Sequence, residues 1–89
     1  MDELMSLREK ITAVDQEILV LFEKRMNLVS QISQYKKEHN LPVEDKEREN
    51  ALLNSLSNKL QNKNLTIYYQ ELLKTFMKVS KDYQKTLHK

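Results

Sequence analysis

The chain has 89 residues, a formal net charge of +2, no Gly, no Cys and one Pro; 39% of its residues are hydrophobic and 31% are charged. These values predict a single, almost entirely helical domain spanning residues 1–89, and the lack of cysteine excludes disulfides, cysteine nucleophiles and thiolate metal sites. They also argue against a nucleic-acid or anionic-membrane partner. With no apolar run of about 18 residues and no signal-peptide core at the charged N-terminus, we expect a cytoplasmic protein.

A long amphipathic helix is predicted from Asp2 to an end at Glu38 to Asn40, because the residue before Pro42 resists helical geometry. Steps of three and four residues connect an apolar seam along this helix. The seam consists of Leu4, Leu7, Ile11, Val14, Ile18, Leu21, Leu28, Ile32 and Tyr35. Its one break is Arg25, a cation in the middle of an apolar stripe.

The length of this helix predicts a homodimer. A helix of about 35 residues is roughly 50 Å long, whereas a compact globule of this size has a radius of gyration of about 12 Å. The helix therefore extends beyond anything that the rest of the chain can wrap around it. We infer that a second copy covers the seam. The alternative is a monomer whose helix breaks near its middle, but no Gly or Pro marks a break.

A short second helix is predicted after a linker at residues 40–44. Asp45 is a good N-cap, and Glu47 and Glu49 favour a helix start because acidic groups interact well with a helix N-terminus. This helix runs to about Leu60. Its apolar face consists of Leu52, Leu53, Leu56 and Leu60.

A third helix of medium length is predicted after a polar loop at residues 61–64. It begins near Leu65 or Thr66 and ends at about Thr86. Its apolar face consists of Leu65, Tyr69, Leu72, Phe76, Val79 and Tyr83. Nothing in the sequence indicates a strand. The predicted fold is therefore all-α, with one long, one short and one medium helix.

Two cations of the long helix suggest an anion site. Arg25 and Lys36 are three turns apart, roughly 16 Å, and differ by only about 20° around the helix axis. Val29 and Ile32 lie between them and give this space an apolar wall. Cations above an apolar wall favour an anion-binding pocket. The alternative is that Arg25 only fixes helix register while Lys36 keeps its ammonium in water.

Polar groups also extend the apolar faces of the other helices. Asp45, Arg48 and Glu49 form either a helix cap with a salt bridge, which is the more usual arrangement, or part of a pocket. Ser80 and Gln84 are four residues apart and share one face, where such residues are usually solvated. The remaining candidates are interpreted as solvated surface residues: His39, His88, Lys78, Lys81, Lys85 and Lys89.

Five segments, taken in chain order, resemble one family. They are LREKI with Arg8, EKRMNLV with Arg25, YKKEH with Lys36, PVEDKERE, and VSKDYQ with Ser80 and Gln84. This order is similar to that of the all-helical chorismate mutases of the shikimate pathway. The similarity covers nearly the whole chain, and its most specific parts are PVEDKERE and the spacing of Arg8, Arg25 and Lys36.

The resemblance implies an isomerase that converts chorismate to prephenate by a [3,3] rearrangement, in phenylalanine and tyrosine biosynthesis, without metal or cofactor. It implies an intertwined homodimer of three-helix chains with two active sites. By similarity, Arg25 and the partner subunit's Arg8 would hold the two substrate carboxylates, with Ser80 in support. Lys36 and Gln84 would donate hydrogen bonds to the ether oxygen. Glu49 would accept from the ring hydroxyl, and Asp45 and Arg48 would lie at the mouth of the site.

The residues themselves agree with this chemistry. Arg8 and Arg25 are 17 residues apart, about 25 Å along one helix, so they cannot both hold one small molecule from the same chain. A dianionic substrate needs guanidinium groups. An intramolecular rearrangement needs no nucleophile, metal or proton relay, which agrees with the lack of such motifs.

Three other functions remain open at this point. One is an isochorismate pyruvate-lyase of the same fold, against which the Glu49 hydroxyl contact and the complete PVEDKERE segment argue. Another is a non-catalytic helical dimerisation module, which explains the seam but leaves the polar residues without a role. A nucleic-acid-binding bundle is disfavoured, because the cations are interleaved with 13 acidic residues and form no basic stripe.

Overall fold

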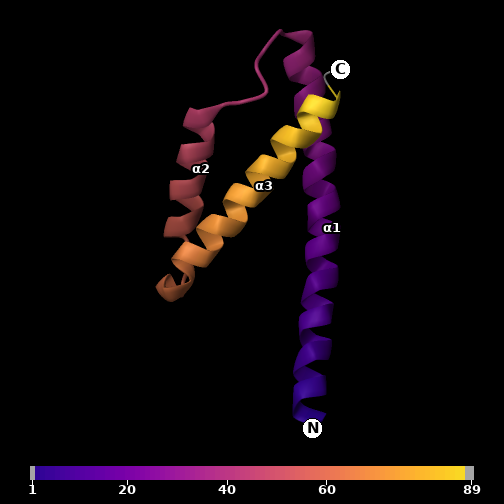
Figure 1. Cartoon of the computed structure of the whole chain (residues 1–89), viewed down its shortest axis with the longest axis vertical. Coiled ribbons are helices and arrows are strands. Elements are labelled where there is room, and N and C mark those ends of the chain that lie inside the picture. Colours follow the sequence, from indigo (N-terminus) through magenta and orange to yellow (C-terminus); the bar gives the residue numbers. More distant parts are fainter. Residues whose placement is uncertain (1, 88–89) are drawn as a thin grey trace.

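The computed structural model describes residues 2–87, which fold into three α-helices and one short 3-10 helix. The elements are α1 (Asp2–Glu38), α2 (Lys46–Asn58), η1 (Lys63–Leu65) and α3 (Thr66–Leu87). Figure 1 shows α1 as a long rod and α3 running diagonally from the end of α2 to the C-terminal half of α1. Residues 2–87 contain no strand. The predicted all-α fold, with one long, one short and one medium helix, is confirmed.

Local signals determine where α1 ends. Asn40 adopts a left-handed conformation with φ of 55°. The Leu41 amide donates to the Lys36 carbonyl at 2.8 Å, and the Asn40 amide donates to the Lys37 carbonyl at 3.4 Å. This pair of bonds is a Schellman motif, which satisfies the last carbonyls of a helix. The predicted end of the long helix is therefore confirmed.

Nearby residues also determine where α2 begins. The Asp45 carboxylate accepts a hydrogen bond from the Arg48 amide at 3.1 Å, and this confirms Asp45 as the N-cap. The helix ends at Asn58, two residues before the predicted end at Leu60.

Within residues 2–87, no helix has both the length and the apolar character needed to cross a bilayer.

The chain is far from compact. Its radius of gyration is 16.4 Å and its extents are 56 × 25 × 15 Å, whereas about 12 Å is expected for a compact globule of this length. In Figure 1 the N-terminal part of α1 extends well beyond α2 and α3. The apolar seam residues are between 45% and 62% exposed. The predicted overshoot of the long helix is confirmed within one chain.

The buried core is small and more than half polar. Its hydrophobic members are Val29, Leu73 and Met77, and its polar members are Ser33, Ser57, Ser80 and Gln84. Two residues of the predicted apolar face of the third helix, Leu65 and Leu72, are 48% and 50% exposed in one chain. The chain covers the neighbouring face of α3 instead, because that face carries the partners of α1.

Candidate functional site

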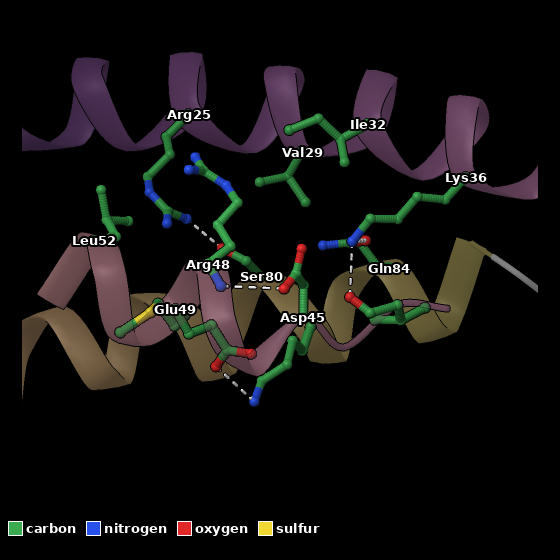
Figure 2. A pocket seen from close by; sticks show the side chains of 13 residues that line it. Arg25, Val29, Ile32, Lys36, Asp45, Arg48, Glu49, Leu52, Ser80 and Gln84 are labelled. Carbon is green, nitrogen blue, oxygen red and sulfur yellow. Dashed lines mark hydrogen bonds and ion pairs between the residues drawn. The ribbon is translucent and has the colours of Figure 1, made fainter. Parts of the chain in front are cut away.

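A cavity of about 120 Å³ lies between the C-terminal half of α1, the start of α2 and the second half of α3. Seven of the eight predicted site residues line this cavity: Arg25, Lys36, Asp45, Arg48, Glu49, Ser80 and Gln84. Figure 2 shows Arg25 and Lys36 reaching from α1 at opposite ends of the cavity, with Val29 and Ile32 between them. The predicted pairing of two cations across an apolar wall is therefore confirmed.

Arg25 is fixed by α3. Its guanidinium donates to the Ser80 hydroxyl oxygen and lies over the Phe76 ring, 5.8 Å from the ring centre. The Ser80 hydroxyl in turn donates to the Phe76 carbonyl at 2.8 Å. Burial of the guanidinium, and then the positive charge of Arg48, lower the pKa of Arg25. Arginine nevertheless stays protonated at physiological pH, so this end of the cavity holds two neighbouring positive charges.

Lys36 is fixed by the linker and by α3. Its ammonium donates to the Val43 carbonyl at 2.7 Å and to the Gln84 side-chain oxygen at 3.4 Å. The alternative in which this ammonium remains in water is wrong, because the turn after α1 brings the linker back over it. Gln84 is only 6% exposed and Ser80 is also 6% exposed. The solvated surroundings that are usual for Ser and Gln on a helix surface therefore do not apply to these two predicted site residues, since each provides a contact to a cation of α1.

The residues at the start of α2 both cap this helix and line the cavity. Asp45 caps the helix through the Arg48 amide, and Asp45, Arg48 and Glu49 all line the cavity. The two predicted alternatives therefore hold at the same time. The salt bridge, however, joins Glu49 to Lys81 of α3, with 3.0 Å between the Glu49 Oε1 and Lys81 Nζ atoms.

Lys81 is the site residue that sequence reasoning missed. Its side chain is 26% exposed and lines the cavity. Its Nζ atom also lies 3.4 Å from Oε1 of Glu44. The hydrogen bond to Glu49 is the main cause that raises the pKa of Lys81. Its position directly after Ser80 was the available signal, because Met77, Ser80, Lys81 and Gln84 share one helical face. The prediction of a solvated Lys81 is wrong.

Three of the other residues predicted to lie on the surface are among residues 2–87. Lys78, Lys85 and His39 are exposed as predicted, and Lys78 pairs with Asp82 at 2.8 Å. His88 and Lys89 lie outside the described residues.

Arg8 is the predicted site residue that the single chain does not bring to the cavity. It is exposed near the start of α1, beside Met5, Glu9 and Thr12. It precedes Arg25 by 17 residues on the same uninterrupted helix, a distance of about 25 Å. Within one chain, Arg25 therefore lines the cavity and Arg8 lies too far away to reach it.

The electrostatics of the cavity favour an anionic ligand. Among residues 2–87, no carboxylate forms an ion pair with Arg25, Lys36 or Arg48. The Oε2 atom of Glu49 is buried and has no hydrogen-bond partner within the described chain. Half-buried cations without a carboxylate, here Arg25 and Lys36, favour an anionic partner, and a buried carboxylate oxygen needs a donor. The arrangement can therefore bind an organic anion that also carries a hydroxyl group.

Similarity to known proteins agrees with this geometry. A family model described as chorismate mutase type II matches residues 7–85. The T-protein of Haemophilus influenzae is 35% identical over 81 residues, which cover 90% of this chain and 22% of that protein. The bifunctional chorismate mutase/prephenate dehydratase of Buchnera aphidicola is 38% identical over 68 residues, or 76% of this chain and 18% of that protein.

A further relative, the bifunctional chorismate mutase/prephenate dehydratase of Aquifex aeolicus, is 38% identical over 56 residues, or 63% of this chain and 16% of that protein. The chain thus spans about a fifth of the length of these curated relatives. No solved structure matches it. Because the family match extends across all three helices and the whole cavity, the chain belongs to the chorismate mutase type II family.

Proposed function

We propose that the protein is a chorismate mutase, which rearranges chorismate to prephenate in phenylalanine and tyrosine biosynthesis. The observation that carries this proposal is the set of three cations, Arg25, Lys36 and Arg48, that line one cavity without a carboxylate partner among residues 2–87. Chorismate is a dianion. Four cations and two carboxylates line the cavity, which leaves an excess of two positive charges for it. The family match and the names of the relatives support the same activity.

The first task of this site is orientation. The rearrangement is intramolecular, so the protein has to hold a flexible substrate in its reactive chair. Guanidinium groups bind carboxylates through paired hydrogen bonds, and Arg25 supplies one such group. Ser80 supports it by accepting from the guanidinium. Arg48, whose charge lies close to Arg25, adds a second positive group at the same end and at the mouth of the cavity.

The second task is stabilisation of charge. As the C–O bond breaks, negative charge grows on the ether oxygen, and fixed donors aimed at that oxygen lower the barrier. The Lys36 ammonium is held at 2.7 Å from the Val43 carbonyl and so needs little rearrangement. Gln84 accepts from Lys36 through its oxygen, and its amide nitrogen serves as the second donor.

The ring hydroxyl is assigned to Glu49. The buried Oε2 atom of this residue has no partner among residues 2–87, and an unpartnered buried acceptor costs about 1–3 kcal/mol. A hydroxyl donor on the substrate would satisfy it. Asp45 is fixed by capping α2 and lies beside this position in the cavity wall.

A homodimer completes the site in this proposal. The seam of α1 is apolar and about half exposed in one chain, which suits burial against a second copy. The cavity of about 120 Å³ is smaller than the roughly 300–1,000 Å³ of most small-molecule sites. The partner subunit's Arg8 would supply the missing wall and bind the second carboxylate, giving two sites per intertwined dimer.

The experiment is a comparison of two substrates. The purified protein is incubated with chorismate or with isochorismate, and the products are identified while ultraviolet absorbance follows substrate loss. Formation of prephenate from chorismate is the expected result. Formation of salicylate and pyruvate from isochorismate alone would assign the protein as the lyase of the same fold. Turnover of neither substrate by a folded protein would leave the dimerisation module as its function.

A further inference from the structure

Lys81 lies where it can control a substrate-binding residue. It follows Ser80 on α3, and its ammonium contacts two carboxylates, Glu49 at 3.0 Å and Glu44 at 3.4 Å. Glu49 belongs to α2 and Glu44 to the linker, so Lys81 connects three segments at the edge of the cavity. Its neighbours Lys78 and Lys85 on the same helix are exposed, so this placement is specific to Lys81.

The two oxygens of the Glu49 carboxylate have different surroundings. Oε1 forms the ion pair with Lys81, whereas Oε2 is buried and has no partner among residues 2–87. A carboxylate without a directional contact rotates about its terminal bond. A charge-assisted hydrogen bond on one oxygen fixes this rotation and so fixes the direction of the other oxygen. Lys81 therefore determines where the free acceptor of Glu49 points.

We propose that Lys81 is a positioning residue, which holds Glu49 through Oε1 so that Oε2 accepts from the ring hydroxyl of the substrate. This inference rests on the proposed function of the cavity. Lys81 has a second effect that acts in the same direction. Its charge neutralises Glu49, which would otherwise place an unpaired carboxylate beside an anionic substrate.

The test uses two substrates that differ in one group. Chorismate is compared with an analogue that lacks the ring hydroxyl, in the wild-type protein and in Lys81→Met. The methionine side chain keeps the length and the apolar stem of lysine but removes the ammonium. We expect kcat/KM for chorismate to fall by about tenfold, as for the loss of one hydrogen bond to a charged group. We expect a much smaller fall for the analogue, because it makes no contact with Glu49.

Matched variants complete the design. Lys78→Met makes the same change three residues earlier, at an exposed position on the same helix, and is expected to leave both rates unchanged. Lys81→Arg restores a cation and is expected to recover most of the preference for chorismate. Circular dichroism verifies that each variant folds, and Lys81→Leu, which also lacks a donor, replaces Lys81→Met if the methionine variant does not.

The outcomes separate this inference from the proposed function. Loss of preference for the hydroxylated substrate, recovered by arginine, supports the positioning role. Equal losses for both substrates, or no loss for either, overturn it while leaving the mutase activity established. If the wild-type protein converts neither compound, the proposed function itself fails.

Discussion

The two halves of α1 carry the same apolar repeat but lie in different surroundings. Every residue from 2 to 24 is exposed in the single chain. From residue 25 to 36, six side chains are buried or half-buried: Arg25, Met26, Val29, Ser30, Ser33 and Lys36. Apart from Arg25, none of these six belongs to the seam, and the seam residues remain exposed along both halves.

This difference shows that the rest of the described chain covers only one of two neighbouring faces of the helix. The face that packs against α3 is rich in polar groups and forms one wall of the cavity. Residues 2–87 leave the apolar face next to it about half exposed, which is why the proposal assigns it to a second copy. Arg25 lies where the two faces meet, so in the proposed dimer it would border both the interface and the cavity.

The largest expected effect comes from placing a charge in the exposed half. Ile18→Glu puts a carboxylate on the seam, where Ile18 is 46% exposed in one chain and buried in the proposed dimer. An unpaired carboxylate in such a core costs several kcal/mol, so we expect loss of the dimer, of thermal stability and of activity. Analytical ultracentrifugation and thermal melting measure this. Glu17→Gln, one residue away and off the seam, is the control; an unchanged dimer in Ile18→Glu would show that the seam is not an interface.

The next effect is at the junction of the two faces. Arg25→Ala removes the guanidinium that contacts Ser80 and Phe76. We expect kcat/KM for chorismate to fall by about a thousandfold, as for the loss of a preorganised charged donor, while the dimer persists. Steady-state kinetics and sizing chromatography check both parts. Lys24→Ala, an exposed neighbour, should behave as wild type; a dissociated Arg25→Ala protein would instead indicate a role in helix register.

A mixing experiment sharpens the comparison between the halves. Arg8→Ala and Lys36→Ala are each expected to be inactive, because each removes one cation from every site. After subunit exchange, about half of the dimers are mixed and each has one intact site, so roughly a quarter of wild-type activity should return. Native mass spectrometry verifies the exchange. If mixed dimers form without activity, Arg8 and Lys36 do not meet across the interface.

The smallest expected effect is that of pH. The lowered pKa of Arg25 remains far above neutrality for a guanidinium, so its charge would be lost only at much higher pH. Gln84 does not titrate. We therefore expect kcat to be nearly flat between about pH 6 and 8, the range in which a histidine would change charge. A steep loss of rate in this range, with unchanged circular dichroism, would place a titrating group where Gln84 is proposed to act.

The helices could be predicted from the sequence because their ends depend on nearby residues. The stop at Asn40 and Pro42 and the cap at Asp45 act within a few positions of where they occur. The cavity could be predicted in part, because Arg25 and Lys36 interrupt or border an apolar stripe. The spacing of these two residues along α1 was enough to place both on the same wall of the cavity.

What the sequence did not reveal has a common physical cause. Hydrophobicity placed Leu65 and Leu72 on an apolar face, but it cannot say which of two neighbouring faces the same chain covers. Ser80, Gln84 and Lys81 are buried or half-buried because their partners, Arg25, Lys36 and Glu49, come from other segments. Such burial depends on tertiary contacts, which the pattern of one helix does not contain.

The turn after α1 has a consequence for variation among relatives. The Lys36 carbonyl accepts a hydrogen bond from the Leu41 amide, and the Lys36 ammonium donates a hydrogen bond to the Val43 carbonyl. Surface loops ordinarily accept insertions at little thermodynamic cost, but each added residue extends a chain by about 3.3–3.6 Å, enough to carry Val43 out of reach. We therefore expect active family members to keep the length of this segment while varying its composition, which an alignment of enzymes with measured activity would verify.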